Sequence, residues 1–380
     1  MLLDSPLGRQ FLVGYLDIGE SPFESGLFEQ LGLGSVSGSS VQLTAGRVWP
    51  RRLRRPRRSL RSRSWRDVSA AEVRALIGAA VAREQWRELA GMGELELLAD
   101  LATFTYRFGF GGGDEVVWAL TALAKEELRP IADALVLAPA TRRWWEPAGL
   151  ADQRFVEWDG PDWPRLSGAS IEQAVHAAAQ ESRERNAEGL RSGRPREREG
   201  TSIGACWWSA PEFADRSWTT SAFGDAPSVA LFGFINSFAP VQDTGATVWS
   251  LRMDAQARVL EITGPADWQR LVSEFPQDVT GTHDGEWRDW GVPGPWRLPD
   301  WEQVMERYDG VHVTIGGYVA SCGLALPADG GYTMLAGWIP GATAWFRDCT
   351  TGATRLGRWQ GSPGGSRGWD DLRDEWTPDG

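Results

Sequence analysis

The hydrophobic period of this chain changes near residue 200, and that change constrains the fold more than any other feature. Before it, apolar residues such as Val73, Leu76 and Ile77 recur at helical spacing. After it come short runs of β-branched and aromatic residues, separated by turn residues. Residues 191–200 are charged and broken by glycine and proline, as is typical of a boundary. The pattern predicts an α+β protein, with a helical N-terminal region followed by a mixed, largely antiparallel sheet domain with short helices.

Two capping boxes mark helix starts in the first half of the chain. In Ser69-Ala-Ala-Glu72 and Ser170-Ile-Glu-Gln173, the serine hydroxyl can accept from the amide three residues on, while the last side chain reaches back. We expect a helix after Ser69 and another that runs to about Gly189. The other elements expected before residue 200 are helices at Leu95–Tyr106 and Asp114–Glu127 and a short strand at Arg154–Trp158.

The second half of the chain alternates short strands with short helices. The expected strands are Ser228–Phe234, Ala246–Arg252, Ala257–Ile262, Gly310–Ile315, Tyr332–Trp338 and Thr343–Arg347. The expected helices are Asp267–Phe275 and Asp300–Arg307. A proline and an aspartate precede the tryptophan at each helix start, where they fix the entry of the chain and cap the first amides.

Composition divides the chain into five segments. Residues 1–46 are weakly patterned, residues 67–200 are mainly helical, and residues 201–350 form the α+β domain that carries the candidate site. Residues 351–380 are expected to form a loose tail rich in glycine and serine. Residues 47–66 hold ten arginines and no acid, so they predict an Arg-rich linker. A functional basic arm and a gene-model artefact stay open as alternatives for this segment.

The charge of the chain bears on its partners. The sequence has 39 basic and 51 acidic residues, a net charge of −12. Outside residues 47–66 there are 29 basic and 51 acidic residues, a charge of −22. An acidic body repels polyanions, which disfavours nucleic acid as its partner. There is no run of about 18 apolar residues and no signal peptide, so we expect no membrane span and a cytoplasmic location.

Several kinds of chemistry are excluded by residue type and spacing. A phosphate-binding P-loop needs Gly-Lys-Ser/Thr, but the single lysine, Lys125, lies in Leu-Ala-Lys-Glu-Glu. The three histidines form no His-x-x-x-His pair, and the three cysteines are too far apart for paired Cys-x-x-Cys ligands. The sequence therefore predicts no metal site, and it leaves the cofactor open.

Candidate catalytic residues lie in the sheet domain. His283 and Asp284 stand side by side in a predicted loop, and His312 lies in a predicted strand. If the two segments meet, these three residues supply acid–base groups that can be tuned near neutral pH. The alternative is that His312 is a polar-face histidine or a hydrogen-bonded core histidine, and that His283 is a surface loop residue.

Neighbouring polar and aromatic residues are candidates for substrate binding. They are Thr280 and Trp287 beside the first segment, and Thr314 and Tyr318 beside the second. The 22 tryptophans have two interpretations, as core residues or as stacking surfaces for a ligand. Core roles are expected for Trp249, Trp268, Trp301, Trp338 and Trp345, and stacking roles for Trp207, Trp208, Trp287, Trp290 and Trp296.

Two resemblances follow from short sequence blocks. The blocks Trp207–Pro211, Arg258–Trp268, Pro299–Val304 with Tyr308–Thr314, and Leu335–Trp338 resemble a family of bacterial proteins without an assigned activity, which implies a shared fold only. Thr219-Thr220-Ser221 resembles the Ser-Thr-Ser block of ADP-ribosyltransferases, which begins a strand and shapes the NAD pocket. Arg154 matches the upstream arginine of that family by order along the chain. No Glu-x-Glu or Gln-x-Glu follows at the catalytic turn, so the resemblance leaves the catalytic glutamate unassigned.

Two functions remain as hypotheses. The first is a transferase similar to ADP-ribosyltransferases that uses NAD as a substrate, with Thr219, Thr220 and Ser221 shaping its pocket. The second is a non-catalytic binding or interaction protein with a Trp-rich surface. The expected partner is a small molecule or another protein.

Overall fold

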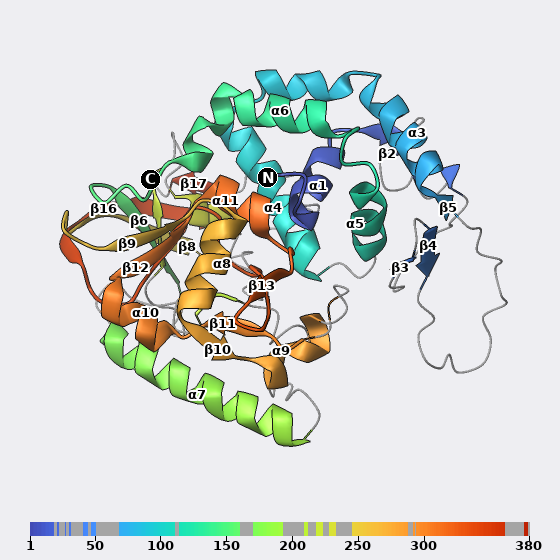
Figure 1. The fold of residues 1–380 in the computed structure, drawn as a ribbon. Helices are drawn as coiled ribbons and strands as arrows, with labels where there is room; N and C mark the ends of the chain where they lie inside the picture. Colours follow the sequence, from blue (N-terminus) through green and yellow to red (C-terminus); the bar gives the residue numbers. More distant parts are fainter. Residues whose placement is uncertain are drawn as a thin grey trace.

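The computed structural model describes a discontinuous part of the chain. The described residues are 1–18, 21–22, 27, 30–31, 41–44, 47–50, 68–110, 114–159, 170–192, 209–211, 218–222, 228–232, 245–287, 292, 294–361 and 376–378. In them the protein is α+β, with a group of helices beside a mixed sheet (Figure 1). This is the predicted fold class.

The helices of the first half begin where the sequence supplies caps. The Ser69 hydroxyl accepts from the Glu72 amide, and the Glu72 carboxylate accepts from the Ser69 amide, so the first capping box is confirmed. The apolar faces of these helices meet in one core that includes Phe11 and Ile77. The helices are α1 (Pro6–Val13), α3 (Ala70–Val81), α4 (Glu94–Phe110), α5 (Asp114–Ala122) and α6 (Arg129–Leu137), with 3₁₀ helices η1 (Gln85–Gly91) and η2 (Pro139–Trp145).

The main sheet draws its strands from both halves of the chain. Only the β12–β9 pair is parallel among its described pairs, so the sheet is mixed and largely antiparallel, as predicted. In order across the sheet, the described strands are β17 (Trp376–Pro378), β16 (Thr350–Gly361), β8 (Gly245–Met253), β6 (Gln153–Trp158), β7 (Trp218–Ser221), β15 (Ala342–Trp345), β12 (Gly310–Val313) and β9 (Val259–Ile262).

An aromatic core covers one face of β12 and its neighbours. Val311 and Val313 point into this core, together with Trp268, Trp301 and Trp338. The ring centroids of Trp301 and Trp338 are 6.1 Å apart, and all three tryptophans have the core role expected for them. The helices on this side are α8 (Pro265–Glu274), α9 (Thr280–Trp287), α10 (Trp301–Arg307) and α11 (Ile315–Ser321). The long α7 (Ile171–Ser192) contacts α9 and α10 and runs along the outside of the molecule (Figure 1).

Local capping places helices where two strands and a loop were expected. The Ser228 hydroxyl accepts from the Ala230 amide, and a 3₁₀ helix, η4 (Val229–Phe232), stands where a strand was expected. Thr314 caps α11 in the same way, so the expected strand at Gly310–Ile315 ends at Val313. The Asp278 carboxylate accepts from the Thr280 amide, and the expected loop at His283 is the helix α9.

Two segments differ from their expected structure because of how they pair with distant parts of the chain. Residues 351–361, expected in a loose tail, belong to β16, which pairs with β8 along its length. Residues 332–338, expected as a strand, contribute only Tyr332 and Thr333 to a small hairpin. The small sheets are β1 (Asp17–Ile18) with β2 (Ser21–Pro22), β3 (Val41–Thr44) with β4 (Arg47–Pro50) and β5 (Val68–Ser69), β10 (Pro276–Asp278) with β11 (Arg297–Pro299), and β13 (Leu326–Ala328) with β14 (Gly331–Thr333).

The Arg-rich segment is described only at its start. Residues 47–50 form β4, and residues 51–66 lie outside the described residues.

Among the helices that the structure describes, none has the length and apolar character required to cross a membrane.

Candidate active site

A row of polar side chains crosses four neighbouring strands on one face of the sheet. In the strand register, Glu261 of β9 lies opposite His312 of β12, His312 opposite Thr343 of β15, and Thr343 opposite Thr219 of β7. Directly opposed residues share a face, so the four side chains form one line, which we call the polar row. It lies on the face opposite to Val311, because side chains alternate along β12.

His312 is a buried, neutral member of the polar row. Its imidazole Nδ1 lies 3.0 Å from the Thr343 hydroxyl, and the side chain is 2% exposed. Burial lowers the pKa of His312 to about 3, because the charged imidazolium loses its hydration there. The imidazole is therefore neutral at physiological pH and acts as a hydrogen-bonding group. The catalytic role predicted for His312 stays a prediction.

Thr219 and Thr220 are held inside the protein by hydrogen bonds. The Thr219 hydroxyl donates to Gln153 Oε1 at 2.6 Å and accepts from the Trp345 indole at 2.8 Å. The Thr220 hydroxyl lies 3.2 Å from that of Ser228, on the other face of the strand. Both threonines are buried, so direct contact between a ligand and either hydroxyl would require the surrounding structure to open.

Ser221 is the member of the same block that reaches partly into solvent. Its hydroxyl oxygen accepts from the Gly149 amide and from Gln153 Nε2, each at 3.1 Å. These two bonds occupy the acceptor positions of the hydroxyl, which leaves its proton to donate. Ser221 is half-buried and Gly149 is exposed, so this donor lies near the surface.

Glu261 ends the polar row and is the residue that the sequence did not single out. Its Oε1 accepts from the Ala148 amide at 3.0 Å, whereas its Oε2 is buried and has no hydrogen-bond partner. Burial raises the pKa of Glu261 to about 7, although the hydrogen bond from the Ala148 amide acts in the opposite direction. A carboxyl group with this pKa is present in both protonation states at neutral pH.

Glu261 and Ser221 approach each other across two consecutive amides. Ala148 donates to Glu261 and Gly149 donates to Ser221. Because neighbouring Cα atoms are only about 3.8 Å apart, the two side-chain oxygens lie within about 10 Å of each other. This arrangement places a hydroxyl donor and a carboxyl group, both on half-buried residues, beside the same two-residue segment, Ala148-Gly149. We call these two groups the Ser221–Glu261 pair.

The second predicted segment forms a separate cluster on α9. His283 Nδ1 lies 2.9 Å from the Thr282 hydroxyl, and the ring centroids of His283 and Trp287 are 4.5 Å apart. Trp287 was expected to stack on a ligand, but it is fully buried and its ring contacts Trp296 of the core. The Thr280 hydroxyl accepts from the Trp296 amide. Asp284 is half-buried on the same helix.

The structure does not bring His283 and His312 together. Trp287, which contacts His283, belongs to the same aromatic core as Val311 and Val313. His312 points to the opposite face of β12, toward Thr343. The sheet thus separates the two histidines, and one bound molecule cannot contact both without a rearrangement of the sheet.

The remaining predicted binding residues have internal partners. The Thr314 hydroxyl accepts from the Gly317 amide at 3.0 Å and caps α11. Tyr318 is buried, and burial, followed by its interaction with Cys322, raises the pKa of its phenol well above 10. The Arg154 guanidinium pairs with Asp152. Trp207, Trp208 and Trp290 lie outside the described residues.

Neither a metal site nor a similar protein helps to assign a function to this geometry. In the part of the chain that the structure describes, no three His, Cys, Asp or Glu residues gather in a way that could hold a metal ion. No family model, no curated protein and no solved structure matches the chain. The candidate site therefore stands on the geometry of the polar row and of the Ser221–Glu261 pair.

Proposed function

We propose that this chain is an enzyme that binds a hydroxyl-bearing small molecule at the Ser221–Glu261 pair, with Glu261 exchanging a proton with it. The observation that carries the proposal is the buried Oε2 of Glu261, which has no hydrogen-bond partner. Buried polar atoms are almost always hydrogen-bonded, so an unsatisfied carboxyl oxygen is a place for a ligand or a proton. Its neighbour His312 stays neutral and adds no positive charge that would hold the carboxylate ionised.

The chemistry of Glu261 suits general acid–base catalysis. An acid whose pKa lies near the working pH is populated in both forms and can take a proton and return it. Perturbed carboxyl groups of this kind concentrate at functional sites. The Ser221 hydroxyl, whose proton is left to donate, would orient a hydroxyl or carbonyl oxygen of the ligand.

NAD is the first ligand to test, and transfer of its ADP-ribose group is the first reaction. Thr219-Thr220-Ser221 resembles the block that shapes the NAD pocket in ADP-ribosyltransferases, and in this chain it forms β7. The ribose hydroxyls of NAD suit a site built from a hydroxyl donor and a carboxyl group. Glu261 would supply the carboxylate that the sequence resemblance leaves unassigned.

The cytoplasmic location stays a prediction.

Calorimetric titration of the full chain with NAD, together with an assay of nicotinamide release, tests the proposal. The full chain is required because β6 and β16 belong to the sheet and lie largely outside residues 201–350. We expect Glu261→Gln to bind NAD within a few-fold of the natural chain and to release nicotinamide about a hundredfold more slowly. Ser221→Ala should weaken binding.

The matched control is Glu306→Gln, which removes an exposed carboxylate on α10 and should change neither measurement. NAD binding without nicotinamide release in the natural chain would favour the alternative of a non-catalytic binding protein. No heat at millimolar NAD would remove NAD as the ligand, and equal release rates in Glu261→Gln and the natural chain would remove Glu261 from the reaction.

The raised pKa of Glu261 also predicts a stability change that does not depend on the ligand. In the folded protein its pKa is about 7, above the ordinary value of 4.5, so its contribution is most favourable below pH 4.5 and is lost as the pH rises through 7. Glu261→Gln mimics the protonated form. We expect it to raise the free energy of unfolding at pH 8 by roughly 1–2 kcal/mol, a figure reduced for solvent screening of the partly exposed carboxyl group.

Urea denaturation at pH 4.5 and pH 8 measures this effect, with Glu306→Gln as the control that should show the same pH dependence as the natural chain. If Glu261→Gln is no more stable than the natural chain at pH 8, the surroundings do not raise the pKa of the carboxyl group. That result would also argue against its proposed proton exchange.

A further inference from the structure

The Gln153 side chain connects Thr219, at one end of the polar row, with Ser221. In the strand register Gln153 of β6 pairs directly with Ser221 of β7, and it is fully buried. Its Oε1 accepts from the Thr219 hydroxyl at 2.6 Å. Its Nε2 donates to Ser221 Oγ at 3.1 Å and to the Gly149 carbonyl at 3.0 Å. The side-chain amide therefore uses its oxygen and both of its protons within the protein.

Groups that can only donate or only accept fix the direction of these hydrogen bonds. The Trp345 indole can only donate, and it donates to the Thr219 hydroxyl at 2.8 Å. The Gly149 carbonyl can only accept, so the Gln153 atom 3.0 Å from it is the amide nitrogen and not the amide oxygen. With the amide reversed, two carbonyl oxygens would face each other at this distance, and the Thr219 proton would lose its acceptor. The orientation of the Gln153 amide is thus determined by its neighbours.

The fixed amide in turn determines the direction of the Ser221 hydroxyl. Its oxygen accepts from Gln153 and from the Gly149 amide, and these two bonds occupy both of its lone pairs. Neither of the two nitrogens can accept the Ser221 proton, and no other group among the described residues accepts it. The hydroxyl therefore presents only its proton to a ligand, on a residue that is half-buried.

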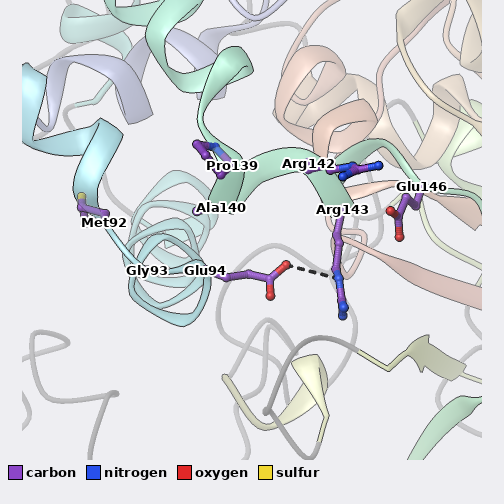
Figure 2. A pocket seen from close by; sticks show the side chains of 8 residues that line it. All are labelled: Met92, Gly93, Glu94, Pro139, Ala140, Arg142, Arg143 and Glu146. Atoms are coloured by element: carbon purple, nitrogen blue, oxygen red, sulfur yellow. Dashed lines mark ion pairs between the residues drawn. The ribbon is translucent and has the colours of Figure 1, made fainter.

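The segment Ala148-Gly149, which carries one of the two donors, is held from both sides. Figure 2 shows η2, which precedes the segment, where Arg143 pairs with Glu94 of α4 at 3.8 Å. On the other side, the Leu150 carbonyl accepts from the Met253 amide of β8 at 2.8 Å. These contacts limit movement of the segment, so its amide stays beside the serine.

We propose that Gln153 is a positioning residue that fixes the Ser221 hydroxyl as a hydrogen-bond donor and thereby selects a ligand with an acceptor atom at this point. Carbonyl, phosphoryl and ribose oxygens meet this requirement, and NAD carries all three, whereas an ammonium group does not meet it. This role rests on the function proposed for the Ser221–Glu261 pair. Gln153 is buried and acts on the ligand only through Ser221.

Gln153→Glu should reverse the hydrogen bond between this side chain and Ser221. A carboxylate still accepts from Thr219 but cannot donate, so the Ser221 proton would turn to the carboxylate and be lost to the ligand. We expect Gln153→Glu and Ser221→Ala each to weaken NAD binding by about tenfold. The double variant should bind NAD within about twofold of Ser221→Ala. Calorimetric titration of the full chain at pH 9, which favours the ionised form of the new carboxyl group, measures all three affinities.

The double variant separates positioning from a general structural effect. A structural defect would weaken NAD binding in the Ser221→Ala background as much as in the natural chain, and that result would overturn the proposal. An unchanged affinity in Gln153→Glu would overturn it as well. The matched control is Gln173→Glu, which makes the same charge change at an exposed position of α7 and should leave NAD binding unchanged.

Neutron diffraction from crystals of the full natural chain in heavy water tests the same role without a ligand or a variant. We expect the two Gln153 deuterons to point at Ser221 Oγ and at the Gly149 carbonyl, and the Ser221 deuteron to point away from both donors. A Ser221 deuteron directed at Gln153 would overturn the proposal, whatever the affinity for NAD. If the natural chain does not bind NAD but the deuterons lie as expected, NAD is the wrong ligand and the positioning role stands.

Discussion

Gly317→Ala is expected to lower the free energy of unfolding by about 3 kcal/mol or more. A Cβ atom at this position would lie 2.4 Å from the Ile262 carbonyl oxygen and 2.8 Å from the Thr314 hydroxyl. Neither atom can move freely, because the carbonyl accepts from the Thr314 amide and the hydroxyl caps α11. Overpacking against backbone costs about 1–3 kcal/mol and more where the neighbours are fixed. Ile262 follows Glu261 directly, so the same change should disturb the candidate site.

Gly78→Ala is the matched control for this substitution. Gly78 lies within α3, and a Cβ atom there would meet nothing closer than Glu127 Cγ at 3.7 Å. Alanine favours a helix over glycine, so this variant should gain about 0.5–1 kcal/mol. Urea denaturation followed by circular dichroism measures both variants. A Gly317→Ala protein as stable as the natural chain would show that α11 can shift away from β9.

His312 is expected to be the main source of acid sensitivity in the sheet. Its folded pKa is about 3, below the ordinary value of 6.5, because burial disfavours the charged form. For a base with a lowered folded pKa, the stabilising contribution is present above pH 6.5 and is lost progressively as the pH falls toward 3. The loss over this window is roughly 4–5 kcal/mol. His312→Gln does not titrate in the window, so it should lose much less stability on acidification.

The measurement is the free energy of unfolding at several pH values between 3 and 7. Below pH 6 the free energy of unfolding should fall more steeply with decreasing pH in the natural chain than in His312→Gln. The difference in slope should approach the value for uptake of one proton on unfolding. His312→Asn gives a second, smaller variant if the glutamine cannot be accommodated. Because Glu261 contributes with the opposite sign between pH 4.5 and 7, the comparison is clearest in a Glu261→Gln background. Parallel slopes in both proteins would mean that His312 is protonated in the folded state.

Local elements were predictable where the signal lies within a few residues. The Ser69 cap and the strand at residues 154–158 are encoded by their own sequence. The helix α9 is not, because Thr-Gly-Thr-His-Asp-Gly has a low helix propensity. Its Gly281 amide donates to Asn186 of α7 at 2.7 Å, and a Cβ atom on Gly281 would lie 2.2 Å from the Asn186 carbonyl oxygen. Contact with α7 therefore stabilises a helix that its local sequence disfavours.

The candidate site was only partly predictable, because it also depends on contacts between residues that are far apart in the sequence. His312 was identified from residue type and alternation, and the Thr219–Ser221 block from its resemblance to ADP-ribosyltransferases. The structure places His312 and Thr219 in one polar row. Glu261 was not identified, since a lone acid in an alternating strand looks like a solvent-facing residue. Its burial depends on the chain at Ala148, over 100 residues away. Trp287 and Trp296 were expected at a ligand surface, but both are fully buried in the aromatic core.

The central position of β6 has a consequence for synthesis of the protein on the ribosome. β6 lies between β7 and β8, both of which are translated after it. Until residue 253 has left the exit tunnel, the nascent chain carries Phe155, Val156 and Trp158 on a strand that lacks at least one of its neighbours. An apolar strand with open edges invites pairing with other chains. Slow translation between β6 and β8 should therefore favour aggregation, and chaperone binding at β6 should favour the native sheet.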